Sequence, residues 1–264
     1  SRQGAGRYKL NKQSLLSVPI MFPPLPEQEK IAEVLGCWDF GIERVEKLIA
    51  AKREMKKGLM QQLLTGKKRF KEFEGQDWKT VRLGDILLES RISGEDDLNR
   101  RLTVSLHLKG VSKREPRTTD REGKTVYFKR KAGQFIYGKQ NLHKGAIGIV
   151  PKQLDGYLSS QDIPCFDLKD GFDVKFLFHY FSRQHFYESL ETIASGTGSK
   201  RIQPKELFRV RVKFPELPEQ QKIASVLNEA DREIELLCDE LEALKRQKKG
   251  LMQKLLTGKI RVKI

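Results

Sequence analysis

The stretch LPEQEKIAEVL, residues 25–35, decides the fold because it returns almost unchanged as LPEQQKIASVL at residues 217–227. A second pair of blocks follows at the same interval: KKGLMQQLLTGK at 56–67 and KKGLMQKLLTGK at 248–259. A shift of 192 residues aligns 23–69 with 215–261 without a gap, and 26 of the 47 aligned pairs are identical. A repeat at a fixed interval indicates one structural element used twice, with a different segment in between.

Apolar residues inside each copy recur at alternating steps of four and three, which is typical of a coiled-coil seam over about four to five heptads. Each copy therefore predicts a helix of about 38 residues, or about 57 Å in length. Lys52 and Lys56 interrupt the stripe of the first copy. The predicted seam consists of Ile31, Leu35, Trp38, Ile42, Ile223, Leu227, Ile234, Leu237, Leu241 and Leu244.

Two matched seams on one chain can cover each other, so antiparallel or mutual pairing of the helices is expected. The alternative is that each helix packs on its own neighbouring domain. Pro26 and Pro218 suit the first turn of a helix, and Gly66 and Gly258 suit the position after its last apolar residue.

Glycine in the middle of a helix costs about 1 kcal/mol relative to alanine. Gly58 and Gly250 lie inside the second repeated block, before the predicted end of each helix. They predict either a close approach of the helices or a short break at that level.

The repeat also extends backwards, since GAGRYKLN at 4–11 aligns with GTGSKRIQ at 196–203. The chain therefore begins partway through a repeat unit. Four parts are expected: the tail of a preceding recognition unit at 1–22, a long helix at 23–67, a mixed domain at 71–214 and a second long helix at 215–264.

The mixed domain is expected to contain many short strands with one or two helices, giving an α+β fold. GQFIYGKQNLHKGAIGIVP predicts two strands around a polar loop, and GYLSSQDIPCFDL predicts another pair of strands. DVKFLFHYFSRQHFYESLETIA is apolar at helical spacing.

The chain carries 51 Lys and Arg against 35 Asp and Glu, a net charge of +16. Residues 71–213 hold 27 basic and 19 acidic residues, or +8 of that excess. A balance so far from neutrality favours a polyanionic partner, most often nucleic acid; the alternative is a basic surface without a partner.

No apolar run is long enough for a membrane span. Three scattered cysteines without CxxC spacing argue against a zinc site and suit a reducing cytoplasm.

Three loops offer the residue types that bind DNA, with cations for phosphates and forked or amide groups for base edges. YGKQNLHKG at 137–145 could instead be an ordinary solvated hairpin. SGTGSKRIQ at 195–203 could be a tight turn before the last strand, and it lacks the order of a P-loop. SKREPRTTDREGK at 112–124 is favoured as a solvated charged face. The candidates are Lys139, Gln140, Asn141, His143, Lys144, Ser199, Lys200, Arg201, Lys113 and Arg114.

The PLPEQ.KIA.VL…KKGLMQ.LLTGK helix that follows a variable α/β segment resembles the specificity subunits of type I restriction–modification systems. The segments W….LGDI, G…Y.K.N….GAIG and GTG..RI….L….V..P.LPEQ resemble the target-recognition domain of that family, and the resemblance covers essentially the whole chain.

The resemblance implies two recognition domains separated by two long helices. Each domain reads one half of a split double-stranded DNA site. The helices set the spacing and dock two methyltransferase subunits, and the restriction subunit joins that assembly. The specificity subunit itself is non-catalytic and holds no cofactor, whereas S-adenosylmethionine is expected in the methyltransferase. This chain has one complete recognition domain, and a homodimer of two such half-subunits would rebuild two.

Other classes of function have weaker support. The sequence has no HExxH, no GxSxG and no cluster of acids around a lysine, so catalysis by this chain is not expected. A coiled-coil adaptor without DNA contact would need only the helices, and the basic domain between them argues against it. The target sequence, the spacer length and whether the chain is a fragment or a natural half-subunit stay open.

Overall fold

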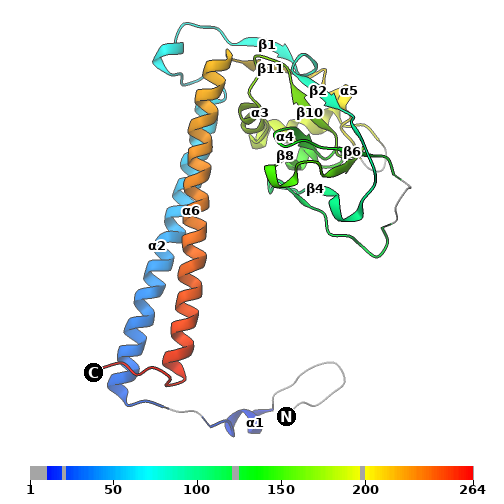
Figure 1. Ribbon diagram of the computed structural model, residues 1–264. Coiled ribbons are helices and arrows are strands. Elements are labelled where there is room, and N and C mark those ends of the chain that lie inside the picture. The colour runs from blue at the N-terminus through cyan, green and yellow to red at the C-terminus, as the bar shows by residue number, and fades with distance from the viewer. Residues whose placement is uncertain (1–10, 20–21, 121–124, 197–199, 264) are drawn as a thin grey trace. The chain divides into compact units, whose positions relative to one another are not determined.

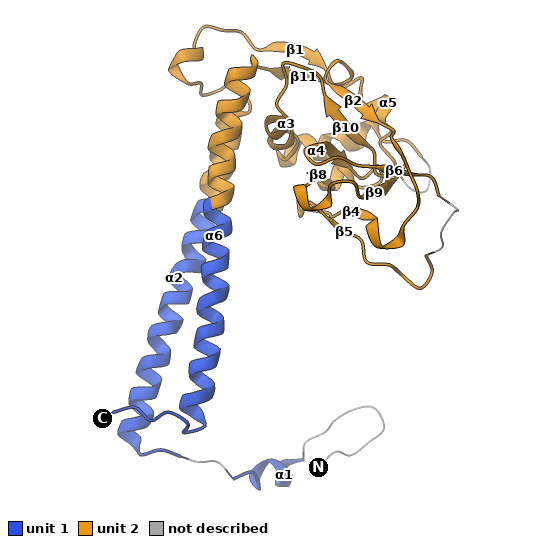
Figure 2. Cartoon of the chain, viewed as in Figure 1, with its two compact units in different colours: residues 1–52, 233–264 blue, residues 53–232 orange. Residues whose placement is uncertain are grey.

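The computed structural model describes residues 11–19, 22–120, 125–196 and 200–263. The chain forms two compact units, which Figure 2 colours separately. Unit 1 comprises residues 1–52 and 233–264, and unit 2 comprises residues 53–232. The candidate Ser199 lies outside the described residues.

Two long helices dominate the chain: α2 (Leu25–Leu63) and α6 (Leu217–Leu256). They run antiparallel and pack against each other, as Figure 1 shows, which confirms the predicted mutual pairing. Ion pairs mark their register, since Lys245 of α6 meets Glu46 at 2.8 Å. A short helix, α1 (Lys12–Leu16), precedes them, with the side chain of Asn11 accepting from the N–H of Ser14 at its start.

The lysines that interrupt the first seam are paired with acids of the other helix. Lys52 contacts Glu233 at 2.5 Å, and Lys56 forms an ion pair with Asp231. Both lysines are partly buried. Each polar interruption of the stripe therefore has a matching carboxylate on α6, which favours this register over a shifted one.

Both long helices end at a glycine in the left-handed conformation, as predicted. Gly66 has φ = 71° and Gly258 has φ = 69°. The N–H of Lys68 donates to the carbonyl of Gln62 (3.2 Å), and the N–H of Ile260 donates to that of Lys254 (3.2 Å). This hydrogen bond, from residue i+6 back to residue i, closes the last turn and needs a residue that tolerates positive φ.

The prediction for Gly58 and Gly250 is wrong. Both helices continue through these positions, and a Cβ atom added to either glycine meets no atom within 4 Å apart from the helix's own backbone. The glycines face open space, so no close contact between the helices requires them. We have no structural explanation for their presence.

The segment between the helices, residues 71–214, is called the central segment below and lies entirely in unit 2. Its described residues confirm the predicted α+β fold, with short antiparallel strands in four small sheets. The largest sheet has the order β2 (Leu87–Ser90), β10 (Cys165–Leu168), β7 (Phe135–Tyr137), β8 (Ile147–Ile149). The remaining sheets are β3 (Ser93–Gly94), β6 (Tyr127–Lys129) and β9 (Leu158–Ser160); β1 (Lys79–Arg82) with β11 (Arg211–Phe214); and β4 (Leu102–Val104) with β5 (Val111–Lys113).

The strands on either side of SSQDIPC form as expected, but they do not pair with each other. β9 pairs with β6, whereas β10 pairs with β2 and β7. The turn between them therefore crosses from one sheet to another.

The predicted helical stretch breaks into two helices, α3 (Val174–Phe181) and α4 (Gln184–Ser189). Asp173 caps α3 by accepting from the N–H of Phe176 at 2.8 Å. A one-turn helix, α5 (Pro204–Leu207), precedes β11. The described residues also form six 3-10 turns: Lys71–Phe73, Leu83–Asp85, Leu98–Arg100, Leu142–Lys144, Lys152–Leu154 and Leu190–Ile193.

The core of unit 2 is aromatic. Phe176 of α3 packs edge-on against Phe214 of β11, with ring centroids 4.9 Å apart. Ile223 and Leu227, from the first turns of α6, are buried in the same cluster. The first part of α6 is thus both a coiled-coil arm and a wall of the domain core.

Candidate nucleic-acid interface

Three loops that are far apart in the sequence meet on one surface of the central segment. The N–H of Lys139 donates to the carbonyl of Asp162 (2.9 Å), and the N–H of Ile202 donates to the carbonyl of Lys139 (2.9 Å). Ser195 and Arg201 exchange two backbone hydrogen bonds of 2.9 and 2.8 Å. Because the first two bonds join one loop to the next and the last two close the third loop, the side chains that the loops carry are presented together.

We call the joined loops the three-loop surface: residues 139–141, 160–163 and 200–203. Tyr137 supports it from the core, where its hydroxyl donates to the carbonyl of Ile202 at 3.0 Å. The ring of Tyr137 stacks on Phe166 with an interplanar angle of 3°. Burial raises the pKa of the Tyr137 hydroxyl, so it remains a neutral donor. The strand β7 therefore holds the third loop as well as starting the first.

Arg201 and Asp162 form an ion pair on this surface, with Nη1 of Arg201 3.2 Å from Oδ1 of Asp162. Both side chains keep much of their exposure, 40% for Arg201 and 51% for Asp162. Lys139 lies close by, and burial lowers the pKa of its amine, while the Asp162 carboxylate opposes that shift. Lys139 also lines a cavity of about 550 Å³ together with Glu89, Arg91 and Gln203.

The other predicted residues of the first loop have different surroundings. Gln140 and Lys144 are exposed, whereas Asn141 and His143 are partly buried. The carbonyl of Asn141 accepts from the N–H groups of Lys144 (2.9 Å) and of Ala146 (3.0 Å), which closes the loop. Burial lowers the pKa of the His143 imidazole, the largest cause of its shift.

Lys200 is held by an acid next to it. Its Nζ lies 2.8 Å from Oε1 of Glu191, and both side chains are exposed. Lys200 lowers the pKa of the Glu191 carboxyl. Exposed pairs of this kind open at little cost, so Lys200 stays accessible to a polyanion.

Lys113 and Arg114 lie on a separate part of the central segment, at the end of β5. Nη2 of Arg114 contacts Oδ1 of Asp120 at 2.6 Å, and Asp120 also lies 4.0 Å from Arg101. Arg101 is buried, donates to both oxygens of Asp96 and stacks over the ring of Tyr127, 4.4 Å from its centroid.

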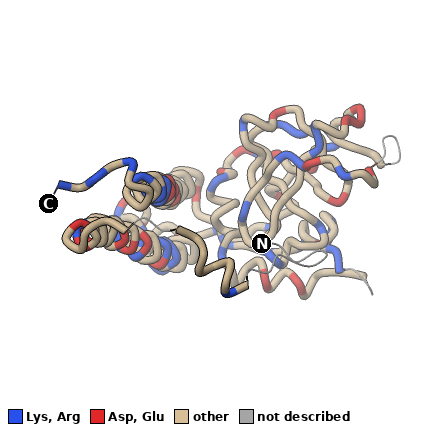
Figure 3. The backbone as a smooth tube through the Cα atoms, turned by 90° about the horizontal axis from the view of Figure 1, so that it is seen from below, with Lys and Arg blue, Asp and Glu red and all other residues tan. Residues whose placement is uncertain are grey.

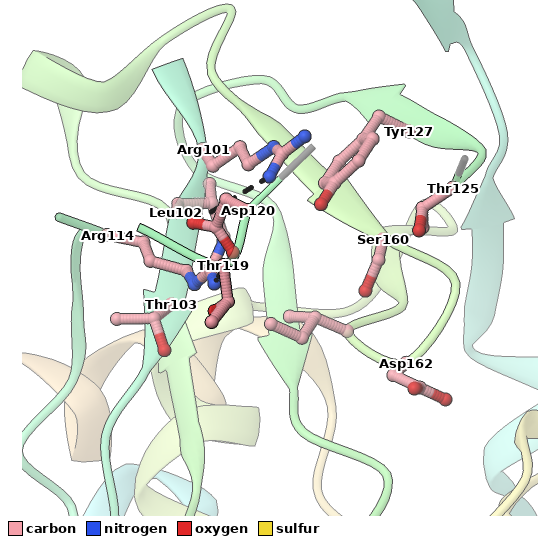
Figure 4. Close-up of a pocket in the computed structure, with 11 residues that line it drawn as sticks. Arg101, Leu102, Thr103, Arg114, Thr119, Asp120, Thr125, Tyr127, Ser160 and Asp162 are labelled. Carbon is pink, nitrogen blue, oxygen red and sulfur yellow. Dashed lines mark hydrogen bonds and ion pairs between the residues drawn. The ribbon is translucent and has the colours of Figure 1, made fainter. Parts of the chain in front are cut away.

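These groups border a cavity of about 600 Å³, shown in Figure 4. Its far wall carries Ser160 and Asp162, which also belong to the three-loop surface. Arg114 thus lines the same cavity as Asp162, the ion-pair partner of Arg201, which lies 87 residues further along the sequence. Thr103, Thr119 and Thr125 add hydroxyl groups to the lining.

Sequence reasoning missed Asp162 and Arg130. Arg130 is fully buried, donates from Nε to Oγ of Ser159 (2.7 Å) and from Nη1 to the carbonyl of Ser90 (2.6 Å). Its Nη2 donates to the carbonyl of Ile163 at 3.3 Å. Neither residue stands out in the sequence: Asp162 is one acid in a turn, and Arg130 is one cation in the basic run KRK.

The predicted seam residues divide by burial. Ile31, Ile42, Ile223 and Leu227 are buried. The other six, which are Leu35, Trp38, Ile234, Leu237, Leu241 and Leu244, are partly exposed. The apolar seam of α6 is therefore partly exposed to solvent between Ile234 and Leu244.

Charge and metal chemistry complete the description. Figure 3 shows Lys and Arg spread along both long helices and through the central segment, mixed with Asp and Glu. Within the described residues, no three His, Cys, Asp or Glu side chains are grouped so that they could hold a metal ion. In that same part of the chain, none of the helices is long and apolar enough to span a membrane.

Comparisons with known proteins agree on one family. Residues 1–51 and 75–246 match the family described as "Type I restriction modification DNA specificity domain". The chain is 28% identical over 291 residues to the putative type I restriction enzyme MjaX specificity subunit of Methanocaldococcus jannaschii, covering 100% of this chain and 64% of that protein. The MjaVIII specificity subunit of the same organism is 28% identical over 282 residues, with 99% and 66% covered.

Solved structures share the fold. The S subunit of a type I restriction–modification system from M. genitalium superposes with a TM-score of 0.57 at 14% identity, covering 88% of this chain and 61% of that one. The chain spans less than two thirds of the length of these curated relatives, 64% and 66%. With the family matched over most of its length, the chain belongs to the type I restriction–modification DNA specificity domain family.

Proposed function

We propose that the chain is the sequence-specific DNA-recognition component of a type I restriction–modification enzyme. The observation that supports this most is the three-loop surface, which joins the predicted residues Lys139 and Arg201 through Asp162. Membership of the specificity family supplies the class of ligand. In this proposal the central segment reads one half of a bipartite site in double-stranded DNA.

Phosphate contacts and base contacts have different requirements, and the loops of the central segment offer both. Exposed lysines such as Lys144, Lys200 and Lys113 provide mobile cations for phosphates. Gln140 and Asn141 carry amides, which pair with adenine through one donor and one acceptor. In the proposed complex, the lysines set affinity and salt dependence, while the amides and Arg201 set sequence preference.

The outer face of α2 is proposed as a docking site for a methyltransferase subunit. Cys37, Phe40, Arg44 and Leu48 lie three or four residues apart, on one face of the helix, and all four are exposed. The positions 192 residues later are Glu229, Arg232, Leu236 and Glu240, which are mostly charged. An apolar stripe bordered by charges on one helix fits an α-helical or flat apolar surface of a partner.

The end of the helix pair in unit 1 is proposed to receive a second recognition domain. In unit 2, Leu64 and Phe214 are buried in the domain core, with exposures of 0% and 2%. Their counterparts in the repeat, Leu256 and Phe22, are 61% and 74% exposed. A second domain of the same kind, contributed by a second copy of this chain, would cover them as the central segment covers Leu64.

In this proposal the chain has no catalytic role. Methyl transfer and its S-adenosylmethionine belong to the methyltransferase subunits, and the restriction subunits join through the complex. The alternative is an assembly protein that uses its helices without reading DNA. It has less support, because the three-loop surface has no role in an adaptor.

Mapping of methylated sites in host DNA tests this proposal. A methylated motif with two short specified halves and unspecified bases between them is the expected result, and it is expected to disappear when the gene for this chain is deleted. A symmetric motif supports two copies of the chain, and an asymmetric motif supports a different second domain. An unchanged methylation pattern after deletion contradicts the proposed function.

A further inference from the structure

The exposed ion pair between Asp162 and Arg201 is held in place by more hydrogen bonds than its small contribution to stability explains. Exposed ion pairs contribute little to stability, so the pair does little to hold the fold. Yet both partners stand on fixed backbones. The Asp162 carbonyl accepts from the N–H of Lys139 (2.9 Å), and Arg201 is bridged to Ser195.

The turn that carries Asp162 is also fixed from inside the protein. The carbonyl of the next residue, Ile163, accepts from Oγ of Ser159 (2.6 Å) and from Nη2 of Arg130 (3.3 Å). Arg130 is fully buried and further bonded to β2 and β9. A buried arginine thus braces an exposed aspartate, which is an arrangement suited to positioning another side chain.

From this geometry, and resting on the proposed function, we infer that Asp162 is a positioning residue that holds the Arg201 guanidinium in one orientation for contact with a guanine in the DNA. Nη1 of Arg201 is engaged by Asp162, and its other N–H groups have no acceptor among the described residues. A guanidinium offers five donors in a planar fork, so enough remain for the O6 and N7 atoms of guanine.

The Asp162 carboxylate also influences whether Arg201 contacts a base or a phosphate. A phosphate bound at Arg201 would lie within a few ångströms of Asp162, where like charges repel. Guanine O6 and N7 are neutral acceptors and meet no such repulsion. Asp162 therefore favours a base edge over the backbone at this position, while Lys144 and Lys113 stay suited to phosphates.

The test is selection of bound duplexes from a randomised DNA library by the reconstituted complex of this chain with its methyltransferase. The chain is compared with Arg201→Ala, Asp162→Ala and the double variant. Wild-type protein is expected to select a motif with a guanine that Arg201→Ala no longer specifies, a loss of about tenfold to a hundredfold in discrimination at that position alone. Asp162→Ala is expected to relax the same position, and the double variant to lose no more than Arg201→Ala.

A matched pair controls for charge. Lys79 and Glu216 form an exposed ion pair of 2.6 Å outside the three-loop surface. Lys79→Ala and Glu216→Ala remove the same charges and are expected to leave the motif intact. Circular dichroism checks that all variants remain folded.

The outcomes are distinguishable. An unchanged motif with Asp162→Ala, or relaxation at a position different from that of Arg201, overturns the positioning role. Uniform weakening on all sequences with Arg201→Ala assigns Arg201 to a phosphate and also overturns the inference. If the wild-type complex selects no motif at all, the proposed function itself fails.

Discussion

Arg69 and Glu219 form a bidentate ion pair, and the repeat makes the same pair a second time. Nε and Nη2 of Arg69 donate to the two oxygens of Glu219, at 2.8 and 2.6 Å. The residues 192 positions away in each case, Arg261 and Glu27, are joined by the same two donors. Trp78 adds a third hydrogen bond to Glu219, from its Nε1 at 3.2 Å. Each copy of the repeat therefore has a bidentate ion pair at the start of its long helix.

Removing Arg69, the ion-pair partner of Glu219, is expected to be strongly destabilising. Glu219 is 1% exposed, and Arg69→Met leaves its carboxylate buried without its charged partner. The free energy of unfolding should fall by about 2 to 3 kcal/mol. Arg261→Met is the matched variant of the other repeat and should also destabilise, because the Glu27 carboxylate that it leaves behind is only 2% exposed. Urea denaturation measures both variants, and an unchanged free energy of unfolding with Arg69→Met would contradict the assignment.

Alanine at Gly58 is expected to stabilise the protein. The site is helical and an added methyl group meets open space, so Gly58→Ala should raise the free energy of unfolding by about 1 kcal/mol. Gly66→Ala is the matched opposite: φ is 71° there and the ring of Trp78 lies 3.5 Å from the added Cβ. It should destabilise by about 1 kcal/mol. Thermal unfolding measures whether each variant is more or less stable than the wild type. A loss of stability with Gly58→Ala would contradict this prediction.

Stability is expected to fall as the pH drops below about 6.5, through His179. Its Nε2 lies 2.9 Å from Oδ1 of Asn228, and among the described residues its Nδ1 has no hydrogen-bond partner. Burial lowers the pKa of His179. The unfolded chain therefore takes up a proton first, and stability that is present above the unfolded pKa is lost as the pH falls toward the folded one.

The charged groups around His179 have opposing effects on its pKa. Lys56 of α2 disfavours its protonation, while Asp231 of α6 and Asp173 favour it. His179→Gln keeps a donor for Asn228 and should flatten the decline in stability between about pH 7 and pH 5. His185→Gln replaces an exposed histidine on α4 and should leave the decline in place. An identical pH profile for His179→Gln and wild type would show that His179 does not cause the decline.

Substitution on the outer face of α2 is expected to weaken methyltransferase binding. Replacing both Phe40 and Leu48 with serine removes two exposed apolar side chains, without touching the seam. The dissociation constant should rise at least tenfold. Leu236→Ser on α6 is the control, at the position that corresponds to Arg44, and should change it little. Isothermal titration calorimetry measures the affinity, and unchanged binding of the double variant would remove this face from the docking site.

The helices could be predicted because their signals are local or repeated. The period of the apolar stripe gave two paired helices, and Gly66 with Gly258 marked their ends within two or three residues. Gly58 was misjudged because the cost of a helical glycine is a local quantity, whereas the space around it depends on packing. The register of the pair depends on contacts such as Lys56 with Asp231, and no local pattern specifies them.

The candidate site was predictable only in parts. Residue type and loop context singled out Lys139 and Arg201 separately. Their connection runs through Asp162, in a turn that links β9 to β10, two strands that pair with different sheets. That arrangement depends on long-range strand pairing and on the buried Arg130, so nothing in the sequence near Asp162 marks it.

The central claim is that the three-loop surface reads DNA sequence, and one equilibrium measurement tests it most directly. The complex of this chain with its methyltransferase is titrated onto duplexes carrying the selected motif or a scrambled version, at several salt concentrations. We predict binding to the motif that is about a thousandfold tighter or more, with affinity falling steeply as salt rises. Equal affinity for both duplexes, or an affinity that does not change with salt, would contradict the account.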